Sequence, residues 1–205
     1  MTGKFLALAR TLLKKDTRAT LSPKALANPT TQAQPHAAYL LIDCSGSMRD
    51  CLPEAVDGAL GFFSGALRRD YYVGLIRFSS RPDLLLEPTR DKSAIERVLR
   101  GLIVEGSTNM AEAIGLAAHA LDIGEFPRAI VLVTDGMPDD AGGHATLEAA
   151  RRARRSGIDI IAIGTGSADH AFLSKLVNRT DLATKVDRPQ LRQAITSAAH
   201  LLPRA

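Results

Sequence analysis

The sequence predicts an α/β fold: a Rossmann-like, doubly wound, mostly parallel six-stranded sheet with one antiparallel edge strand and helices on both faces. Two observations lead to this prediction. Short apolar runs alternate with segments whose apolar residues recur at helical spacing, which is typical of parallel strands joined by helices. The second and third runs are separated only by residues 79–82. This stretch is too short for a crossover helix and therefore predicts an antiparallel hairpin.

Six apolar runs are expected to form the strands. They are residues 38–43, 71–79, 83–87, 129–134, 158–164 and roughly 183–187. The fourth and fifth runs are almost continuously apolar, as strands buried on both faces are. Helical spacing of apolar residues marks six further segments as helices. They are residues 56–67, 95–102, 114–121, 144–156, 168–178 and 189–202.

The composition is that of an ordinary globular protein. The chain has 205 residues, of which 45% are hydrophobic and 23% charged, enough for one sizeable domain. No run of 18 apolar residues is present, so no membrane-spanning helix is expected. Cys44 and Cys51 form no CxxC pair, which argues against a disulfide framework and a structural zinc site. Basic residues interrupt the apolar amino-terminal stretch before a signal-peptide core is complete, so a cytoplasmic location is expected.

Charge and proline divide the chain into two parts. Residues 1–37 are predicted to hold an amphipathic basic helix, at 4–15, followed by a proline-containing linker, and residues 38–205 to form the main domain. Residues 1–35 carry six Lys and Arg against one acidic residue, whereas the other 170 residues carry 20 basic and 21 acidic side chains. The domain therefore gives no reason to expect nucleic-acid binding. The amino-terminal segment has one aromatic residue, Phe5, too little apolar area for stable membrane anchoring, and is expected to dock on protein.

Oxygen-bearing side chains gather in three loops. The sequence DCSGSM follows the first strand, GSTNM precedes the third helix and TDG ends the fourth strand. Open α/β sheets bind ligands beyond the carboxyl ends of their strands, where the winding reverses. Carboxylate and hydroxyl oxygens without sulfur or imidazole suit Mg²⁺ or Mn²⁺ better than Zn²⁺ or Cu²⁺. The candidate metal ligands are Asp43, Ser45, Ser47, Thr108 and Asp135.

Helix capping is the alternative role for the three hydroxyl residues. Ser45 and Ser47 precede one helical segment and Thr108 precedes another, as N-cap residues do. The two aspartates do not share this explanation. Asp43 and Asp135 both end apolar strands, and two carboxylates brought close together there would repel each other. A bound cation would remove that conflict, so the residues taken together favour a metal site.

The three motifs resemble the metal-ion-dependent adhesion site of von Willebrand factor type A domains, and the resemblance covers residues 38–202. It implies that Ser45, Ser47 and Thr108 bind the metal through their hydroxyls. It also implies that Asp43 and Asp135 bind the metal directly or through water. The metal would be Mg²⁺, with Mn²⁺ as the substitute, and a protein partner would supply an Asp or Glu to it. Small bacterial members of the intracellular branch include partners of AAA+ ATPases and modules of stress or signalling systems.

Two other functions are alternatives to metal-dependent recognition. A haloacid-dehalogenase-like, Mg²⁺-dependent phosphatase needs a second aspartate where this chain has Ser45, and no P-loop or GxSxG motif is present. No catalytic residue is therefore assigned, and Gly164-Thr165-Gly166 alone is a weak phosphate-binding signal. A structural scaffold with a vestigial metal site is the other alternative. Asp139 and Asp140 could influence partner choice by repelling acidic surfaces, or simply form a polar loop.

Overall fold

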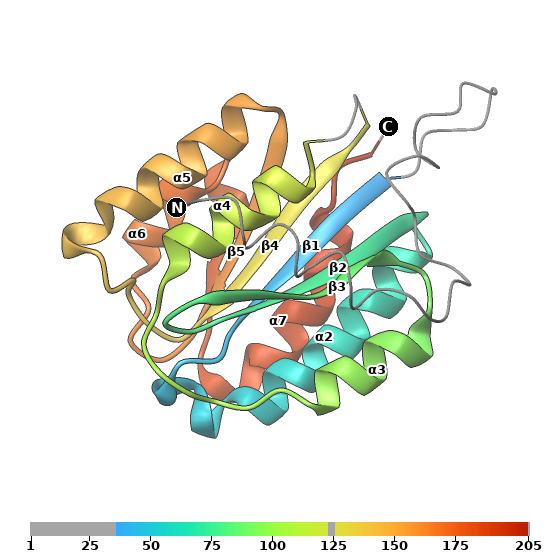
Figure 1. Cartoon of the computed structure of the whole chain (residues 1–205), viewed down its shortest axis with the longest axis horizontal. Helices are drawn as coiled ribbons and strands as arrows, with labels where there is room; N and C mark the ends of the chain where they lie inside the picture. The colour runs from blue at the N-terminus through green and yellow to red at the C-terminus, as the bar shows by residue number, and fades with distance from the viewer. Residues whose placement is uncertain (1–35, 123–125, 205) are drawn as a thin grey trace, which may run out of the picture.

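A six-stranded sheet forms the centre of the molecule (Figure 1). The computed structural model describes residues 36–122 and 126–204, so the predicted helix at 4–15 and nearly all of the linker lie outside it. The sheet order is β3-β2-β1-β4-β5-β6. All neighbouring strands are parallel except β2 and β3, which pair antiparallel. The strands are β1 (His36–Asp43), β2 (Tyr71–Phe78), β3 (Pro82–Thr89), β4 (Arg128–Thr134), β5 (Ile158–Gly164) and β6 (Ala183–Lys185).

This topology confirms the predicted doubly wound sheet and its antiparallel edge hairpin. The strand boundaries agree with the apolar runs to within a few residues. β1 begins at His36, two residues before the predicted start, and β6 ends at Lys185, two residues before the predicted end. Successive strands are added on one side of β1 and then, from β4 onward, on the other. The winding therefore reverses between β1 and β4, and the loops that follow these two strands meet there.

Helices cover both faces of the sheet. In Figure 1, α2 (Leu52–Leu67), α3 (Lys92–Arg100) and α7 (Leu191–Ser197) lie together on one face. On the other face, α4 (Met110–Ala120) packs against α5 (His144–Arg155), which also contacts α6 (His170–Leu176). Within the described part of the chain, none of the helices is long and apolar enough to cross a membrane.

The last helix is shorter than its apolar spacing indicated. The sequence pattern predicts one helix over residues 189–202, whereas the structure has a 3-10 turn at Arg188–Gln190, α7, and a second 3-10 turn at Ala198–Leu201. The single-helix prediction was therefore wrong in its boundaries. Leu191 and Ile195 of α7 and Ala198 of the turn that follows are all buried. The apolar spacing therefore reflects burial rather than one continuous α-helix.

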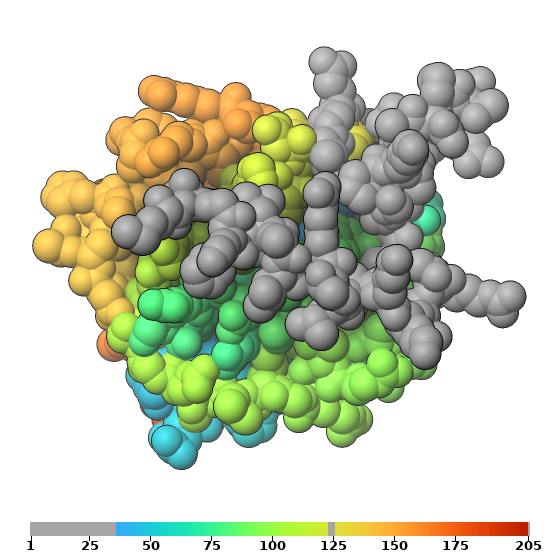
Figure 2. All heavy atoms as spheres, in the orientation of Figure 1, coloured from blue at the N-terminus to red at the C-terminus, as the bar shows by residue number. Residues whose placement is uncertain are grey.

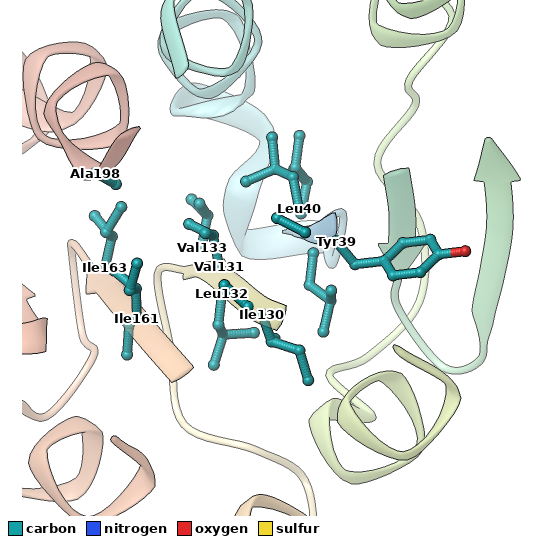
Figure 3. Packing of buried hydrophobic residues seen from close by; sticks show 14 of the residues in the cluster. Tyr39, Leu40, Ile130, Val131, Leu132, Val133, Ile161, Ile163 and Ala198 are labelled. Atoms are coloured by element: carbon teal, nitrogen blue, oxygen red, sulfur yellow. The ribbon is translucent and has the colours of Figure 1, made fainter. Parts of the chain in front are cut away.

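The core lies on both faces of the two central strands. Residues 130–133 of β4 are all fully buried, and in Figure 3 Val131 and Val133 extend to one side of the strand while Ile130 and Leu132 extend to the other. Successive side chains of a strand point to opposite faces, so both helical layers pack against β4. Burial on both faces explains why this run is continuously apolar, and it fixes the position at which the strand ends and the polar loop begins.

Candidate metal site

The predicted site lies where β1 and β4 end. Asp43 is the last residue of β1 and is fully buried, while Asp135 directly follows β4 and is 3% exposed. The two strands are parallel neighbours in the sheet, with Ile42 paired to Val133. The structure thus brings the two carboxylates to the same edge of the sheet, as the sequence predicted.

Both oxygens of Asp43 accept hydrogen bonds. The Ser45 backbone N–H donates to Oδ1 at 2.8 Å, and the Thr134 hydroxyl donates to Oδ2 at 2.7 Å. Burial raises the pKa of Asp43, these hydrogen bonds lower it in part, and the nearby charge of Asp135 raises it further. The carboxylate is thus oriented by a hydrogen bond to each oxygen, and among the described residues no cationic side chain lowers its pKa. Thr134, which is not among the candidate metal ligands, therefore orients Asp43.

Ser45 and Ser47 form a chain of oxygens that leads to Asp135. The two serine hydroxyls lie 3.1 Å apart, and the Ser47 hydroxyl donates to Asp135 Oδ1 at 2.7 Å. Ser45 occupies the N-cap position of the 3-10 turn Gly46–Asp50, yet its side chain makes no capping hydrogen bond. The capping alternative is therefore wrong for Ser45. The hydroxyls point toward the carboxylate rather than toward the helix backbone.

Thr108 reaches the site on the loop that precedes α4. The N-cap of α4 is Asn109, whose side chain accepts from the Glu112 N–H at 3.2 Å, so capping is also the wrong role for Thr108. The loop is tied to the first motif by the Gly46 N–H, which donates to the Gly106 carbonyl at 3.2 Å. Among the described residues, hydrogen bonds join Ser45, Ser47 and the two aspartates into one network. Thr108, which is 7% exposed, bonds through its backbone to Asp139 and is not part of that network; its loop meets the first motif at Gly106.

Two aspartates in the loop after β4 have distinct roles. Asp139 Oδ2 accepts from the Thr108 N–H at 2.6 Å, and the Asp139 N–H donates to the Thr108 carbonyl at 3.1 Å. Asp140 instead accepts from the Ala145 N–H at 2.8 Å and from the Thr146 hydroxyl at 2.6 Å, at the start of α5. Each aspartate of this polar loop thus has its own hydrogen-bond partners, and an influence of the two on partner choice stays a prediction. Asp139 positions a predicted metal ligand, and Asp140 stabilises a helix terminus.

The loop after β5 holds the backbone of Asp135. The Asp135 carbonyl accepts from the Ser167 N–H at 2.8 Å and from the Ser167 hydroxyl at 3.0 Å. Gly166 has a φ of +55°, and a Cβ at this position would lie 3.1 Å from the Asp135 carbonyl oxygen. A glycine is therefore required for both conformation and space. The sequence Gly164-Thr165-Gly166, a weak phosphate-binding signal, thus lies at the end of β5 and in the loop that fixes Asp135.

The chemistry of the donor set fits a hard cation. Nowhere in residues 36–122 and 126–204 do three or more His, Cys, Asp or Glu side chains form a group able to hold a metal. A metal here would therefore depend on the hydroxyl oxygens of Ser45, Ser47 and Thr108. Cys44 lies between two of the predicted ligands, but burial raises the pKa of its thiol to about 12. It is a neutral, fully buried side chain rather than a thiolate ligand.

Known proteins resemble this chain in sequence and in fold. Residues 38–137 match the family model of the von Willebrand factor type A domain. A UPF0353 protein of Mycobacterium leprae is 32% identical over 167 residues, covering 70% of this chain and 49% of the relative. The chain spans less than half the length of the first curated relatives that it matches.

Two solved structures extend the comparison to the fold. The von Willebrand factor domain of the type V pili tip protein Mfa5 from Porphyromonas gingivalis superposes with a TM-score of 0.74 at 14% identity, covering 83% of this chain and 97% of that one. Proximal thread matrix protein 1 from the mussel byssus, in a structure with a zinc-occupied MIDAS motif, superposes with a TM-score of 0.63 at 16% identity, covering 82% and 46%. Residues 38–137 thus match the von Willebrand factor type A domain, and the sheet order and the superpositions show that the chain has the fold of these domains.

Proposed function

We propose that this protein is a metal-dependent recognition domain that binds Mg²⁺ through Asp43, Ser45, Ser47, Thr108 and Asp135 and uses the bound ion to recognise an acidic residue of a partner protein. The observation that carries the proposal is the orientation of the serine hydroxyls. Ser45 and Ser47 point along a line of oxygens to the Asp135 carboxylate, although the helix terminus beside them would accept a capping side chain. The domain family is one of metal-dependent adhesion and interaction modules.

The choice of ion follows from the ligands. Carboxylate and hydroxyl oxygens are hard donors, which Mg²⁺ and Mn²⁺ prefer, and the buried Cys44 thiol offers no soft ligand. The zinc-occupied site of the mussel protein supports a divalent ion at this place in the fold. At cellular concentrations Mg²⁺ is the expected occupant, and Mn²⁺ the expected substitute.

The need for a partner follows from charge. Three neutral hydroxyls donate little negative charge to a divalent ion. The two carboxylates are already engaged by Thr134, Ser45 and Ser47. The ion would therefore keep a strong attraction for one more anionic ligand, which a carboxylate of a partner would satisfy. Ser47 and Met137 are both exposed beside the site, with 40% of Met137 accessible, so a partner surface has polar and apolar contacts around the ion.

Two alternatives make different predictions. A phosphatase would hydrolyse a generic phosphate ester in the presence of Mg²⁺, although the position where that mechanism needs an acid is Ser45. A scaffold with a vestigial site would show no response to Mg²⁺ at all. We infer that the partner belongs to a bacterial intracellular complex, of the AAA+ ATPase-associated or stress-signalling type, because of the resemblance to that branch of the family.

The proposal is tested by capture of partners from the native cell. The immobilised protein is exposed to extract in Mg²⁺ and in EDTA, as wild type, as Thr108→Ala and as Ser174→Ala. Ser174 is the matched control because its hydroxyl donates to the His170 carbonyl of its own helix and, in the described part of the chain, to no residue of the site. We expect a captured protein that is lost in EDTA and in Thr108→Ala but retained in Ser174→Ala. Capture that is equal in all samples, or hydrolysis of p-nitrophenyl phosphate that Thr108→Ala abolishes, would overturn the proposal.

A further inference from the structure

A groove with a volume of about 590 Å³ lies between α4 and α5. The space-filling view shows the surfaces of α4 (yellow-green) and α5 (amber) beside each other on one face of the molecule (Figure 2), on the side of the sheet opposite α2 and α7 in Figure 1. Small side chains form much of its lining. These are Ala111, Gly115 and Ala118 from α4, and Ala145 and Ala149 from α5.

Gly115 has no packing role among the described residues. It lies in the middle of α4, where glycine favours the helix less than alanine does, and a Cβ at this position would meet no atom within 4 Å. The glycines of α2 show what such residues do elsewhere in this fold. A Cβ at Gly58 would lie 2.8 Å from Ile195, and one at Gly65 would lie 2.6 Å from Ala199, because α7 and the turn after it pack closely there. Because Gly115 has no side chain, a helix from outside the described residues could pack against α4 as closely as α7 packs against α2.

We propose that residues 4–15 of this chain form a helix that docks in the groove between α4 and α5. The segment holds Phe5, Leu8 and Leu12 at spacings of three and four residues, which places them on one face of a helix. A helix of 12 residues is about 18 Å long, and α4, with 11 residues, is about 16 Å long. The segment thus matches the groove in length and supplies large apolar side chains that can pack against the small ones of the lining.

The chain enters the described structure beside one end of the groove. Ala37 pairs with Arg128 in the sheet, and the guanidinium of Arg128 donates to the carbonyls of Leu121 and Ser156. Leu121 precedes Asp122, and both Asp122 and Ser156 line the groove. Residues 16–35 are 20 residues long and span up to about 66 Å when extended. The linker therefore reaches from His36 to any point along the groove, which makes docking within one molecule possible at low entropic cost.

The charges of the segment and the groove favour this docking. The groove carries the carboxylates of Glu112 and Asp122 against one guanidinium, that of Arg152. Residues 4–15 carry Lys4, Arg10, Lys14 and Lys15 and no acidic residue. On a helix Lys4 and Lys15 flank the apolar face, where they meet the polar rim of a groove. Arg10 and Lys14 lie on the opposite side of the helix and face solvent. Residues 4–15 of a second copy of the chain would meet the same charges in the groove. The test therefore distinguishes docking within one molecule from docking between two molecules.

Disulfide trapping in the full chain tests the proposal. Phe5→Cys, Leu8→Cys and Leu12→Cys are each combined with Gly115→Cys, and the control combines each of them with Asp57→Cys. Asp57 is exposed on α2, on the other face of the sheet, and the native Cys44 and Cys51 are fully buried and do not compete. We expect at least one pair with Gly115→Cys to form an intramolecular disulfide at least tenfold faster than its control. Equal rates for the two sets would overturn the proposal, and so would disulfides found only between molecules.

Filling the groove gives a second test. Gly115→Trp places a large side chain where a Cβ meets open space, so the fold remains intact, as the thermal midpoint would verify. We expect amide hydrogen exchange of residues 4–15 to accelerate at least tenfold in Gly115→Trp and to stay near the wild-type rate in Asp57→Trp. Unprotected amides at 4–15 in the wild type, or exchange rates unaffected by Gly115→Trp, would contradict docking at this groove.

Discussion

The Ser47 hydroxyl donates a hydrogen bond of 2.7 Å to Asp135 Oδ1, across 88 residues of sequence. This bond joins the loop after β1 to the residue after β4. The winding of the sheet reverses between these two strands. A serine that is exposed at a helix terminus commonly caps the helix. In this protein it is instead part of a set of oxygens, which is the basis of the proposed metal site.

Replacement of Ser47 by alanine should weaken Mg²⁺ binding while leaving the fold intact. The hydroxyl is both a predicted ligand and the group that orients Asp135, so we expect the dissociation constant to rise by about 10- to 100-fold. Because Ser47 is exposed, the thermal midpoint without metal should change little. Isothermal titration with MgCl₂ and thermal unfolding in EDTA measure the two quantities. An unchanged dissociation constant would remove Ser47 from the ligand set.

Mg²⁺ should raise the thermal midpoint of the wild-type protein. An ion that binds only the native state, at 100 times its dissociation constant, contributes about 2.7 kcal/mol. For a domain of this size that corresponds to about 5–11 °C. Asp43→Ala should abolish the rise because it removes the carboxylate at the end of β1. Differential scanning fluorimetry with and without MgCl₂ checks this, and a rise of equal size in Asp43→Ala would show that the ion binds elsewhere.

Alanine variants of the neighbouring residues Asp139 and Asp140 should differ in their effect on Mg²⁺ affinity. Asp139→Ala removes the carboxylate that accepts from the Thr108 N–H, so Mg²⁺ affinity should fall about tenfold or more, as it does when groups that orient metal ligands are lost. Asp140→Ala removes the hydrogen bonds at the start of α5. That change should cost about 1 kcal/mol of unfolding free energy and leave Mg²⁺ affinity unchanged. If both variants lost affinity equally, the specific link between Asp139 and Thr108 would be refuted.

Alanine variants of Gly166 and Gly157 should show whether Gly166 specifically supports Asp135. Both glycines have positive φ, so both variants strain the backbone, but only Gly166 lies against Asp135. Gly166→Ala and Gly157→Ala place a Cβ on residues with φ of +55° and +76°, and each should destabilise the fold by about 1–2 kcal/mol. Only the Cβ at position 166 would approach the Asp135 carbonyl, at 3.1 Å, whereas the one at 157 would approach the Arg128 guanidinium. Mg²⁺ affinity should therefore fall in Gly166→Ala alone. Urea unfolding and calorimetric titration provide the comparison, and equal affinities in the two variants would count against this role.

The sequence predicted the sheet well because the apolar runs that mark the strands reflect burial of those strands in the core. The residues of β4 must be apolar on both faces, and the short link before Pro82 leaves no room for a helix, so the strands and the hairpin follow from local patterns. The DCSGSM and TDG motifs end such strands, and topology alone brings them together. The last helix was less predictable, because burial of Leu191, Ile195 and Ala198 is compatible with α-helix and 3-10 turns alike.

The groups that support the site could not be predicted from local patterns. Thr108 and Asp139 are 31 residues apart and meet only when the loop before α4 folds over the loop after β4. Ser167 and Asp135 are 32 residues apart and meet because β5 lies beside β4. Their side chains are common in polar loops, so nothing in the sequence distinguishes them. The distinction between Asp139 and Asp140 likewise depends on which backbone N–H each faces in three dimensions.

The most direct test of the proposed site is calorimetric titration of Mg²⁺ into three forms of the full chain. These are the wild type, the double variant Ser45→Ala/Thr108→Ala, and the control Ser174→Ala, whose hydroxyl lies in α6. The account predicts one binding site per chain in the wild type and in Ser174→Ala, and loss of measurable binding in the double variant with its thermal midpoint in EDTA preserved. Equal Mg²⁺ binding in all three forms, or no binding in the wild type, would contradict it.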